Sequence, residues 1–343
     1  MAKILYGIAK EGMGHAVRSK VLIKGLSENH KFLILAGGKQ YNFLKKSFNN
    51  IICIDDFDLT YINNSISYTL TFLKNLFKFP FIIYYIIKNY KLIKRFDPDL
   101  IISDFEPITN YLSYLLKKPL ITVDNQHIST KCNIQFPKNY NKDFFISSVV
   151  IYSIITNAGY YLIPTFFYPQ VKEKNVFLVP PVIRKEIQDA KILCKDHIIV
   201  YQTSGSNKRL MQLLKKTGNN YIFYGSRRKK DGNITFKQFS ETEFIDDLAS
   251  CKAVITNGGF GLISEAIYLK KPVLSIPIKK QFEQILNAVY LKKLGYGAYH
   301  LEITKKRLDH FINNIDIYKR RLQSIKKHDN SMILKKIEEI LHS

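Results

Sequence analysis

The sequence predicts an α/β fold of two domains, each built around a parallel β-sheet. Both halves open in the same way, with an apolar strand that runs into a turn containing glycine or serine and then into helix-like sequence, at residues 3–15 and 197–206. Short apolar runs alternate with helical patterns, as in sheets whose strands are joined by right-handed crossovers. Between the halves, Val179-Pro180-Pro181-Val182 places paired prolines that stop both a helix and a central strand.

The length of 343 residues also fits two domains, since domains cluster near about 100–150 residues. We expect an N-terminal domain over residues 1–178 and a linker over 179–184. A second domain should follow over residues 185–325. The last segment, 326–343, should form a helix that packs back on the first domain.

The expected strands are short apolar runs. In the first half they are Lys3–Ala9, Lys31–Ala36, Ile51–Ile54, Leu100–Ser103 and Leu120–Val123. In the second half they are His197–Gln202, Tyr221–Tyr224, Ile234–Phe236, Ala253–Thr256 and Val273–Ile276. The charge-free segment Phe144–Val171 is interrupted by serine, asparagine and proline, which favours a buried helix and then a strand at Gly159–Ile163 over a membrane span.

The chain is strongly basic, with 52 Lys and Arg against 28 Asp and Glu and a formal net charge of +24. Such an excess favours a polyanionic partner: nucleic acid, an anionic membrane or phosphorylated substrates. The alternative is scattered lysine of the kind that AT-rich coding produces. The four cysteines, Cys53, Cys132, Cys194 and Cys251, form no C-x-x-C pair and are expected to be reduced and mostly buried. With no signal peptide expected, this indicates a cytoplasmic protein.

The second half concentrates its polar and glycine residues between residues 253 and 288. A strand ends at Thr256, and the glycines of Asn257-Gly258-Gly259-Phe260-Gly261 let the backbone approach a ligand closely. The helix that begins there points N–H groups and the positive end of its dipole at an anion. This pattern predicts a phosphate site that needs no metal.

Three side chains further along suit a sugar nucleotide. Glu265 lies in the first turns of that helix and can accept two hydroxyls of a ribose. Glu283 and Gln284 follow the carboxyl end of a strand, where ligands of open α/β sheets bind. A carboxylate beside an amide can bind neighbouring hydroxyls of a sugar.

This stretch resembles the donor-site signature of GT-B glycosyltransferases. Plant-type UDP-glycosyltransferases carry H-C-G-W-N-S-x-x-E, then G-x-P, then D-Q-x-x-N-A; this chain has N-G-G-F-G-L-I-S-E, K-K-P and E-Q-I-L-N-A in the same order. The peptidoglycan lipid-intermediate N-acetylglucosaminyltransferase carries a related S-G-x-x-x-x-S-E and Q-x-x-N-A. The resemblance implies two Rossmann-like domains whose parallel sheets face each other across a cleft.

The resemblance also implies roles on the donor side. Gly259 and its neighbours should hold the diphosphate, Glu265 the ribose, and Glu283 with Gln284 the sugar. Phe239 lies 18 residues before Asn257, where the plant-type family places a Trp stacked on uracil. Asn257 replaces that family's phosphate-binding His, so backbone amides should matter more, helped by the turn around Ser204. The donor-site residues expected are Asn257, Gly258, Gly259, Phe260, Glu265, Glu283, Gln284, Ser204 and Phe239.

The first half opens with Glu11-Gly12-Met13-Gly14-His15, which resembles the G-x-G-H loop of the same superfamily. In many inverting members this His is the general base on the acceptor hydroxyl, and imidazole suits that role because it titrates near neutral pH. Asp104, at a strand end, is the expected partner, with Glu106 as a competing carboxylate. Residues 125–127 follow the next strand end. The acceptor-side residues expected are Gly12, Gly14, Gln126 and His127.

The reaction implied is a direct displacement at the anomeric carbon that inverts its configuration, with His15 and Asp104 as the catalytic pair. No cofactor or metal is expected. Asp56-Phe57-Asp58 and Asp97-Pro98-Asp99 match the bare D-x-D metal pattern of the other glycosyltransferase fold, but the two-half organisation argues against that fold.

Residues 59–96 contain no acidic residue and combine lysines with many aromatic and aliphatic residues. They read as two amphipathic helices, Tyr68–Leu76 and Phe81–Ile93, on either side of Pro80. Base plus apolar surface suits the headgroup region of an anionic membrane. The alternative is that the aromatic residues form core and the lysines are background.

The function expected is therefore an inverting glycosyltransferase that moves a sugar from a nucleotide-sugar donor, UDP-linked, to a hydroxyl acceptor. The acceptor is expected to be lipid-linked or a cell-envelope glycan, with the enzyme peripheral on the inner face of the cell membrane. Alternatives are a UDP-sugar 2-epimerase of the same fold and a basic, non-enzymatic polyanion-binding protein. Nucleic acid is the least favoured partner. The sugar, the nucleotide base and the oligomeric state stay open.

Overall fold

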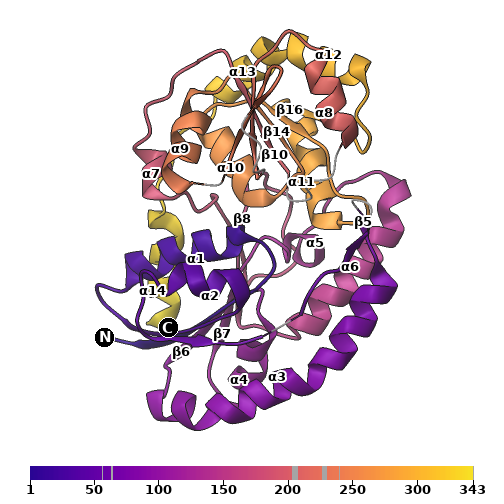
Figure 1. Cartoon of the computed structure of the whole chain (residues 1–343). Helices are drawn as coiled ribbons and strands as arrows, with labels where there is room; N and C mark the ends of the chain where they lie inside the picture. The colour runs from indigo at the N-terminus through magenta and orange to yellow at the C-terminus, as the bar shows by residue number, and fades with distance from the viewer. Residues whose placement is uncertain (56, 63–64, 203–207, 226–229, 239, 343) are drawn as a thin grey trace. The chain divides into compact units, whose positions relative to one another are not determined.

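The computed structural model describes the chain except for residues 56, 63–64, 203–207, 226–229, 239 and 343 (Figure 1). The chain forms two compact units. The first contains Met1–Thr60, Ser67–Val182 and Asp329–Ser343. The second contains Tyr61–Ile66 and Ile183–His328.

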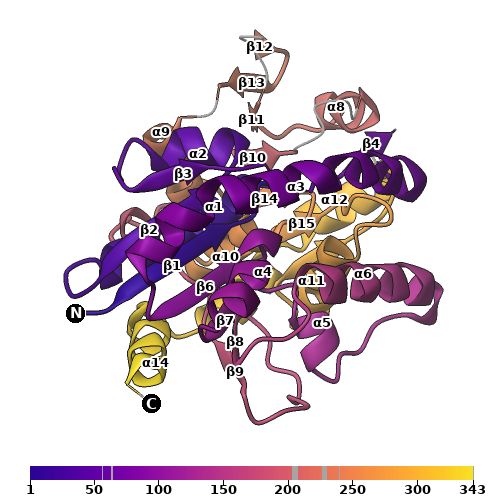
Figure 2. The same ribbon diagram turned by 90° about the horizontal axis from the view of Figure 1, so that it is seen from below.

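The first unit is built on a parallel sheet in the order β3-β2-β1-β6-β7-β8-β9, which Figure 2 shows from below. Its strands are β1 (Lys3–Ile8), β2 (Lys31–Ala36), β3 (Ile51–Cys53), β6 (Leu100–Asp104), β7 (Leu120–Val123), β8 (Tyr160–Pro164) and β9 (Val176–Val179). The chain leaves β1 toward β2 on one side and returns to β6 on the other, so the strand order reverses between β1 and β6. Ligands of open α/β sheets bind at such a reversal.

Most helices of the first unit connect these strands, and α14 is the C-terminal helix of the chain. The helices of this unit are α1 (Met13–Leu26), α2 (Gly38–Leu44), α3 (Tyr68–Phe96), α4 (Pro107–Leu116), α5 (Ile128–Lys131), α6 (Asn141–Ile154) and α14 (Ser331–Leu341), with a 3-10 turn at Lys138–Tyr140.

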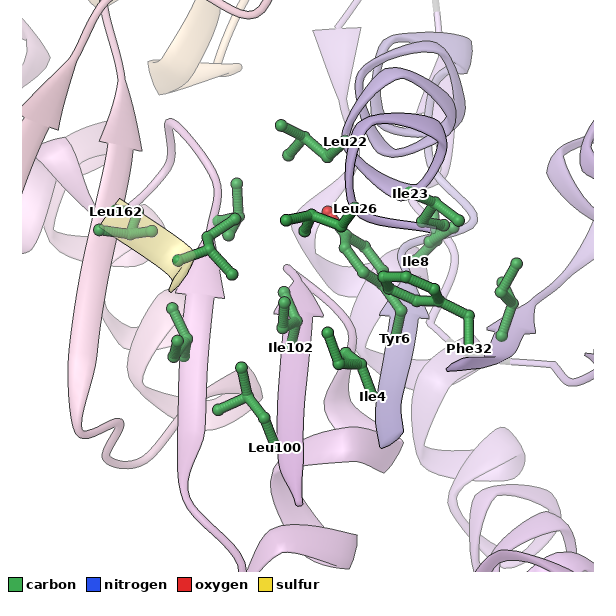
Figure 3. Close-up of a cluster of buried hydrophobic side chains, with 14 of the residues drawn as sticks. Ile4, Tyr6, Ile8, Leu22, Ile23, Leu26, Phe32, Leu100, Ile102 and Leu162 are labelled. Atoms are coloured by element: carbon green, nitrogen blue, oxygen red, sulfur yellow. The ribbon is translucent and has the colours of Figure 1, made fainter. Parts of the chain in front are cut away.

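The core of the first unit lies between the sheet and α1. Ile4, Tyr6 and Ile8 of β1 are buried beside Leu22 and Leu26 of α1, as Figure 3 shows. Residues 4–8 of β1 are all buried, and such near-continuous buried runs are typical of parallel strands covered on both faces.

The second unit repeats this plan with the order β12-β13-β11-β10-β14-β15-β16, parallel except for the antiparallel pair of β12 and β13. Its strands are β10 (Ile198–Tyr201), β11 (Tyr221–Tyr224), β12 (Lys230–Asp231), β13 (Ile234–Lys237), β14 (Ala253–Thr256), β15 (Val273–Ser275) and β16 (Gly297–Tyr299). The strand order reverses between β10 and β14, the counterpart of the reversal in the first unit.

The helices of the second unit are α7 (Lys185–Gln188), α8 (Lys208–Lys215), α9 (Glu241–Ser250), α10 (Phe260–Tyr268), α11 (Phe282–Lys293), α12 (Lys305–Asn313) and α13 (Ile315–Gln323). A small hairpin of β4 (Tyr61–Ile62) and β5 (Ser65–Ile66) also belongs to this unit, where the Ile66 N–H donates to the Lys279 carbonyl at 3.2 Å.

The unit boundaries differ by a few residues from those expected. The first unit continues to Val182 because β9 is the last strand of its sheet, and the second begins at Ile183. The tail rejoins the first unit at Asp329, where Ile333 and Ile337 of α14 are buried in the core. The Nε2 of His30 lies 2.9 Å from the Glu338 carboxylate and adds a polar contact between α14 and this unit.

Three local predictions were wrong. The two helices expected around Pro80 form one helix, α3 (Figure 1). Pro80 lies within it and is exposed. The helix expected to be buried within Phe144–Val171 is α6, of which only Ile151 and Ile154 are buried. Cys53 and Cys194 are exposed, whereas Cys132 and Cys251 are buried as expected. The first error concerns the continuity of a helix through a proline, and the other two concern which side chains are buried, which local composition does not fix.

Candidate active site at the sheet reversals

In the first unit, the reversal between β1 and β6 brings two sequence-distant side chains together. β1 leads into Gly12, which precedes α1 with a φ of 82°, and His15 lies in the first turn of that helix. Asp104 is the last residue of β6 and is fully buried. Because β1 and β6 are parallel neighbours, their carboxyl ends meet at one edge of the sheet.

His15 and Asp104 form a short hydrogen bond, with Nδ1 of His15 2.6 Å from Oδ1 of Asp104. An ionised carboxylate can only accept, so Nδ1 of the neutral imidazole carries the proton. The lone pair then lies on Nε2. The pairing of these two residues expected from the sequence is therefore present in the structure.

Arg18 joins this pair and was not anticipated from the sequence. Its Nε donates to Oδ2 of Asp104 at 3.1 Å and its Nη2 to Oδ1 at 2.5 Å, a two-pronged contact. Ser19 Oγ also donates to Oδ2 at 2.8 Å. The spacing of Arg18 three residues after His15 on a helix could have signalled a shared face.

The electrostatics of the pair follow from this arrangement. Burial alone would raise the pKa of Asp104, but Arg18 and then His15 hold it below its usual range. Burial alone would lower the pKa of Arg18, and the neighbouring Asp104 outweighs it and raises the pKa. Both groups therefore stay charged in the folded protein.

The loop after β7 supplies further polar side chains beside His15. Gln126 Nε2 lies 3.3 Å from His15 Nε2, and Arg18 Nη1 lies 3.4 Å from Asn125 Oδ1. His127 instead turns to Asp124, with Nδ1 2.8 Å from Oδ2, and both are buried. Gln126 therefore lies within hydrogen-bond reach of the imidazole nitrogen that faces away from Asp104, whereas His127 pairs with Asp124 instead.

The loop that precedes α1, residues 10–14, is held by hydrogen bonds to its backbone and has open space at its two glycines. Gln40 Nε2 donates to the carbonyls of Lys10 and Gly12, at 2.5 and 3.2 Å. A Cβ atom added at Gly12 or Gly14 would meet nothing within 4 Å. There is therefore open space at both glycines, next to His15 in the chain.

Glu106 is not a competing partner of His15. Its Oε1 accepts from the Ile108 N–H at 2.6 Å and its Oε2 from the Thr109 N–H at 2.8 Å, so it caps the start of α4. Burial raises its pKa to about 7 despite these bonds. Gly7 of β1 lies against it, since a Cβ there would come within 2.5 Å of Oε2.

In the second unit, the loop after β14 approaches the start of α10 as the motif predicted. Gly258 has a φ of 107°, and Gly259 is the N-cap of α10. A Cβ at Gly259 would meet nothing within 4 Å, whereas one at Gly258 would lie 2.8 Å from Ser275 Oγ. One glycine therefore shapes the loop, and its neighbour leaves open space at the helix start.

The amides of the motif fasten this loop. Asn257 Nδ2 donates to the Ile276 carbonyl at 3.2 Å, and Asn287 Nδ2 donates to the Gly258 carbonyl at 3.2 Å. Gln284, which is buried, accepts the Ile278 N–H through Oε1 at 3.0 Å. The E-Q-I-L-N-A segment thus holds two loops in place, the one at Gly258 and the one after β15.

Glu265 is buried rather than solvated, and it is paired with Arg184. Arg184 Nε donates to Oε1 at 2.7 Å and Nη2 to Oε2 at 2.8 Å, with exposures of 9% and 7% for the two residues. Arg184 follows the prolines of the expected linker and was not predicted from the sequence as a site residue. The carboxylate oxygens retain further lone pairs for hydroxyl donors.

The remaining predicted donor residues divide into two groups. Phe260 is buried at the first position of α10, and Glu283 is partly exposed in the first turn of α11. Ser204 and Phe239 lie outside the described residues.

Among the described residues, no group of three or more His, Cys, Asp or Glu side chains could hold a metal ion. In the D-x-D segments, Asp58 pairs with Lys10 and Lys78, and Asp97 pairs with Lys118.

Comparison with known proteins places this geometry in a family. The family model described as Glycosyl transferase family 1 matches residues 2–316. An uncharacterized glycosyltransferase of Methanosarcina acetivorans is 26% identical over 338 residues, covering 86% of this chain and 82% of the relative. A UDP-N-acetylglucosamine--N-acetylmuramyl-(pentapeptide) pyrophosphoryl-undecaprenol N-acetylglucosamine transferase of Bacillus thuringiensis is 26% identical, covering 71% of this chain and 73% of the relative.

Solved structures agree on the fold. CalG4, the calicheamicin glycosyltransferase, superposes with a TM-score of 0.71 at 14% identity, covering 100% of this chain and 98% of that chain. MurG of Acinetobacter baumannii superposes with a TM-score of 0.61 at 15% identity, covering 99% and 100%. The expected GT-B fold and the expected glycosyltransferase activity are confirmed at this level. Because the family model spans nearly all of the sequence, the chain belongs to glycosyl transferase family 1 and is a glycosyltransferase.

Proposed function

We propose that this glycosyltransferase inverts the sugar it transfers, with a UDP-linked donor and with His15 as general base on an acceptor hydroxyl. The observation that carries the proposal is the 2.6 Å contact between His15 Nδ1 and Asp104 Oδ1, which leaves Nε2 available to take a proton. Gln126 Nε2 lies 3.3 Å from that nitrogen and can donate to it, so an acceptor hydroxyl would take over this hydrogen-bonding position.

The reaction then proceeds in one displacement. The acceptor oxygen attacks the anomeric carbon as its proton passes to His15 Nε2. The bond between the anomeric carbon and the diphosphate oxygen breaks, and its electron pair leaves with the nucleoside diphosphate. Attack opposite the leaving group inverts the configuration, and Asp104 orients the imidazole and stabilises its protonated form.

On the donor side, the start of α10 is suited to the diphosphate. The N–H groups of its first turn and its dipole favour negative charge, and Gly259 leaves space for close approach. The buried Glu265 would receive ribose hydroxyls through lone pairs that Arg184 does not use. Glu283 and Gln284 would contact the sugar.

The decisive experiment measures nucleoside diphosphate release from a panel of UDP-, GDP- and dTDP-sugars. His15→Ala should lower the rate by about 10²–10⁴-fold, since that is the typical contribution of a general base. His310→Ala, an exposed histidine of α12, is the matched control and should retain the wild-type rate. Equal rates for His15→Ala and wild type would refute the base role, and no hydrolysis or binding of any nucleotide sugar would refute the donor assignment.

We also propose that the acceptor is lipid-linked and that the first unit binds an anionic membrane through α3. The helix spans 29 residues, from Tyr68 to Phe96, and is long and apolar enough to cross a membrane. Only Ile82 and Ile93 are buried, and Phe77 is 75% exposed. The exposed apolar side chains of α3 are Leu70, Phe72, Leu73, Leu76, Phe77, Phe79, Phe81, Ile83, Tyr84, Ile87 and Leu92.

In the first half of α3 the polar side chains face the unit and the apolar side chains face outward, the reverse of an ordinary surface helix. The inward side of α3 is polar, with Asn75 bonded to the backbone of Asp58 and Lys78 paired with Asp55 and Asp58. An ordinary surface helix turns its apolar stripe to the core and its charges to water. The inner face ties α3 to its unit, which supports a helix lying along a membrane surface rather than spanning it.

Lysines border this apolar face and suit anionic headgroups. Lys88, Lys91, Lys94 and Arg95 of α3 are exposed, whereas the exposed Lys74 pairs with Asp58. Free cysteines, two of them exposed, support a reducing compartment and hence the cytoplasmic leaflet.

Co-sedimentation with vesicles tests this second proposal. Binding should be strong with vesicles containing phosphatidylglycerol, weak with pure phosphatidylcholine, and reduced by salt. Replacing Phe72, Phe77 and Phe81 by Ser should lower binding at least about tenfold while leaving the fold intact, since all three are exposed. Leu115→Ser with Met332→Ser, which removes exposed apolar side chains elsewhere, is the control. Equal binding by the triple variant and wild type would refute a membrane role for α3.

A further inference from the structure

The carboxylate of Asp104 is shared between two basic side chains. His15 and Arg18 lie three residues apart on α1, so they project from one face of the helix. Oδ1 of Asp104 receives His15 at 2.6 Å and Arg18 Nη2 at 2.5 Å. Oδ2 receives Arg18 Nε at 3.1 Å and Ser19 Oγ at 2.8 Å. These bonds account for about four acceptor positions, the full capacity of a carboxylate.

The shared carboxylate changes the charge balance of the base. In a simple His–Asp pair, the imidazolium formed during reaction meets one uncompensated negative charge. Here Arg18 already neutralises Asp104, and its Nη2 lies 3.1 Å from His15 Nδ1. Protonation of His15 therefore places two cations beside one anion.

We propose that Arg18 is a positioning residue that keeps His15 deprotonated, and thus ready to accept a proton, by holding a fixed positive charge against the shared carboxylate of Asp104. This inference rests on the proposed role of His15 as base and concerns how that role is regulated. It assigns a function to a buried cation, 7% exposed, that the reaction itself does not require.

The physical basis is that a like charge disfavours the charged form of a titrating group and an opposite charge favours it. Burial strengthens both effects because water screens them less. Arg18 cannot lose its proton, so its influence is constant across the working pH range. Asp104 alone would pull His15 toward the imidazolium, and Arg18 offsets that pull.

The other ionisable groups near this cluster do not reverse the balance. Asp124, which follows β7, bonds to His127 through both carboxylate oxygens. Tyr6 of β1 is neutral, because burial and then Asp104 raise its pKa. Gln126, which faces His15 Nε2, is uncharged.

The titration of His15 can be followed directly by NMR on histidine-labelled protein, with His15→Gln used to assign the resonance. Arg18→Met removes the charge and keeps the length of the side chain. It should raise the pH at which His15 loses its proton by at least about one unit, the size of shift that a neighbouring charge produces. Arg18→Lys retains the charge and should titrate close to wild type. Asp104→Asn should shift the titration in the opposite direction.

Enzyme activity gives the second readout. In Arg18→Met the acid limb of the kcat/KM profile should move to higher pH in step with the NMR titration, so that activity lost at neutral pH recovers in alkaline buffer. A purely structural role would instead lower activity equally at every pH. Should Arg18→Met fail to fold, Arg18→Gln, which can still donate to Asp104 but carries no charge, tests the same shift.

The two proposals fail in different ways. An unchanged His15 titration in the folded neutral variants would overturn the inference about Arg18, whatever the activity. A shifted titration that the pH profile does not follow would uphold the effect of Arg18 on His15 and overturn the role of His15 as base.

Discussion

Gly258 offers the sharpest test of how the donor loop is built, through the substitution Gly258→Ala. Its φ of 107° lies in the region that side chains with a Cβ avoid. An added Cβ would also lie 2.8 Å from Ser275 Oγ and 3.0 Å from the backbone oxygen of Gln284. The hydroxyl can rotate away, but the backbone oxygen belongs to the buried helix α11 and cannot move freely.

The expected loss of stability follows from these two terms. A residue held in a sparsely populated backbone region costs about 1–3 kcal/mol. Overpacking against a fixed neighbour adds about 1–3 kcal/mol. Gly258→Ala should therefore lower the free energy of unfolding by about 2–6 kcal/mol, measured by urea denaturation.

Gly259→Ala is the matched control, one residue away. Gly259 has a φ of −61° and open space around its Cβ position, so alanine should change the unfolding free energy by less than about 0.5 kcal/mol. If the open space receives the donor diphosphate, the same substitution should weaken UDP-sugar binding in calorimetry. Equal stability losses in the two variants would refute the strain argument, and unchanged donor affinity in Gly259→Ala would refute the phosphate assignment.

Three further predictions concern stability. Arg184→Met should destabilise the second unit by about 3–5 kcal/mol in urea titrations, because it leaves the buried Glu265 without its cation; no loss would contradict a buried ion pair. Ile337→Ala should cost about 2–5 kcal/mol by opening a cavity under α14, whereas the exposed Met332→Ala should be nearly neutral; equal effects would place α14 outside the core. Lysines hold the pKa of Asp58 below its usual value even though burial opposes them, so its contribution is present above about pH 4 and is lost as pH falls further; Asp58→Asn should flatten that acid loss in thermal unfolding scans, and an unchanged acid slope would refute the coupling.

The fold could be predicted well where strands are apolar on both faces. Runs such as Leu100–Ser103 and Ala253–Thr256 are strands at or near their predicted bounds, because a buried parallel strand needs little besides apolar residues. β9 and β16 were missed. β9 overlaps the region interpreted as a linker, and β16 contains only Gly-Ala-Tyr, whose place as an edge strand depends on β15 beside it.

The candidate site also contains residues that the sequence could predict and residues that it could not. His15 and Asp104 could be paired from the sequence because both follow strand ends, and neighbouring parallel strands bring their carboxyl ends to one edge. The contacts of Arg18 and Arg184 could not be predicted, because the sequence does not indicate which carboxylate a long, flexible side chain will reach. The apolar residues of α3 were recognised, but their outward direction depended on Lys78 finding Asp55 and Asp58 on the inner side.

The sequence by itself determined the two-part α/β architecture, the glycine loop before α10 and the residues of the base pair, because strand periodicity and motif spacing are local properties of the chain. Only the tertiary structure decided that Asp104 and Glu265 each share their charge with a buried arginine, and that α3 turns its apolar side outward. Those features arise from side chains 81 to 86 residues apart, or from which helix face meets the sheet. No local pattern encodes such contacts, because burial and pairing depend on the packing of the whole unit.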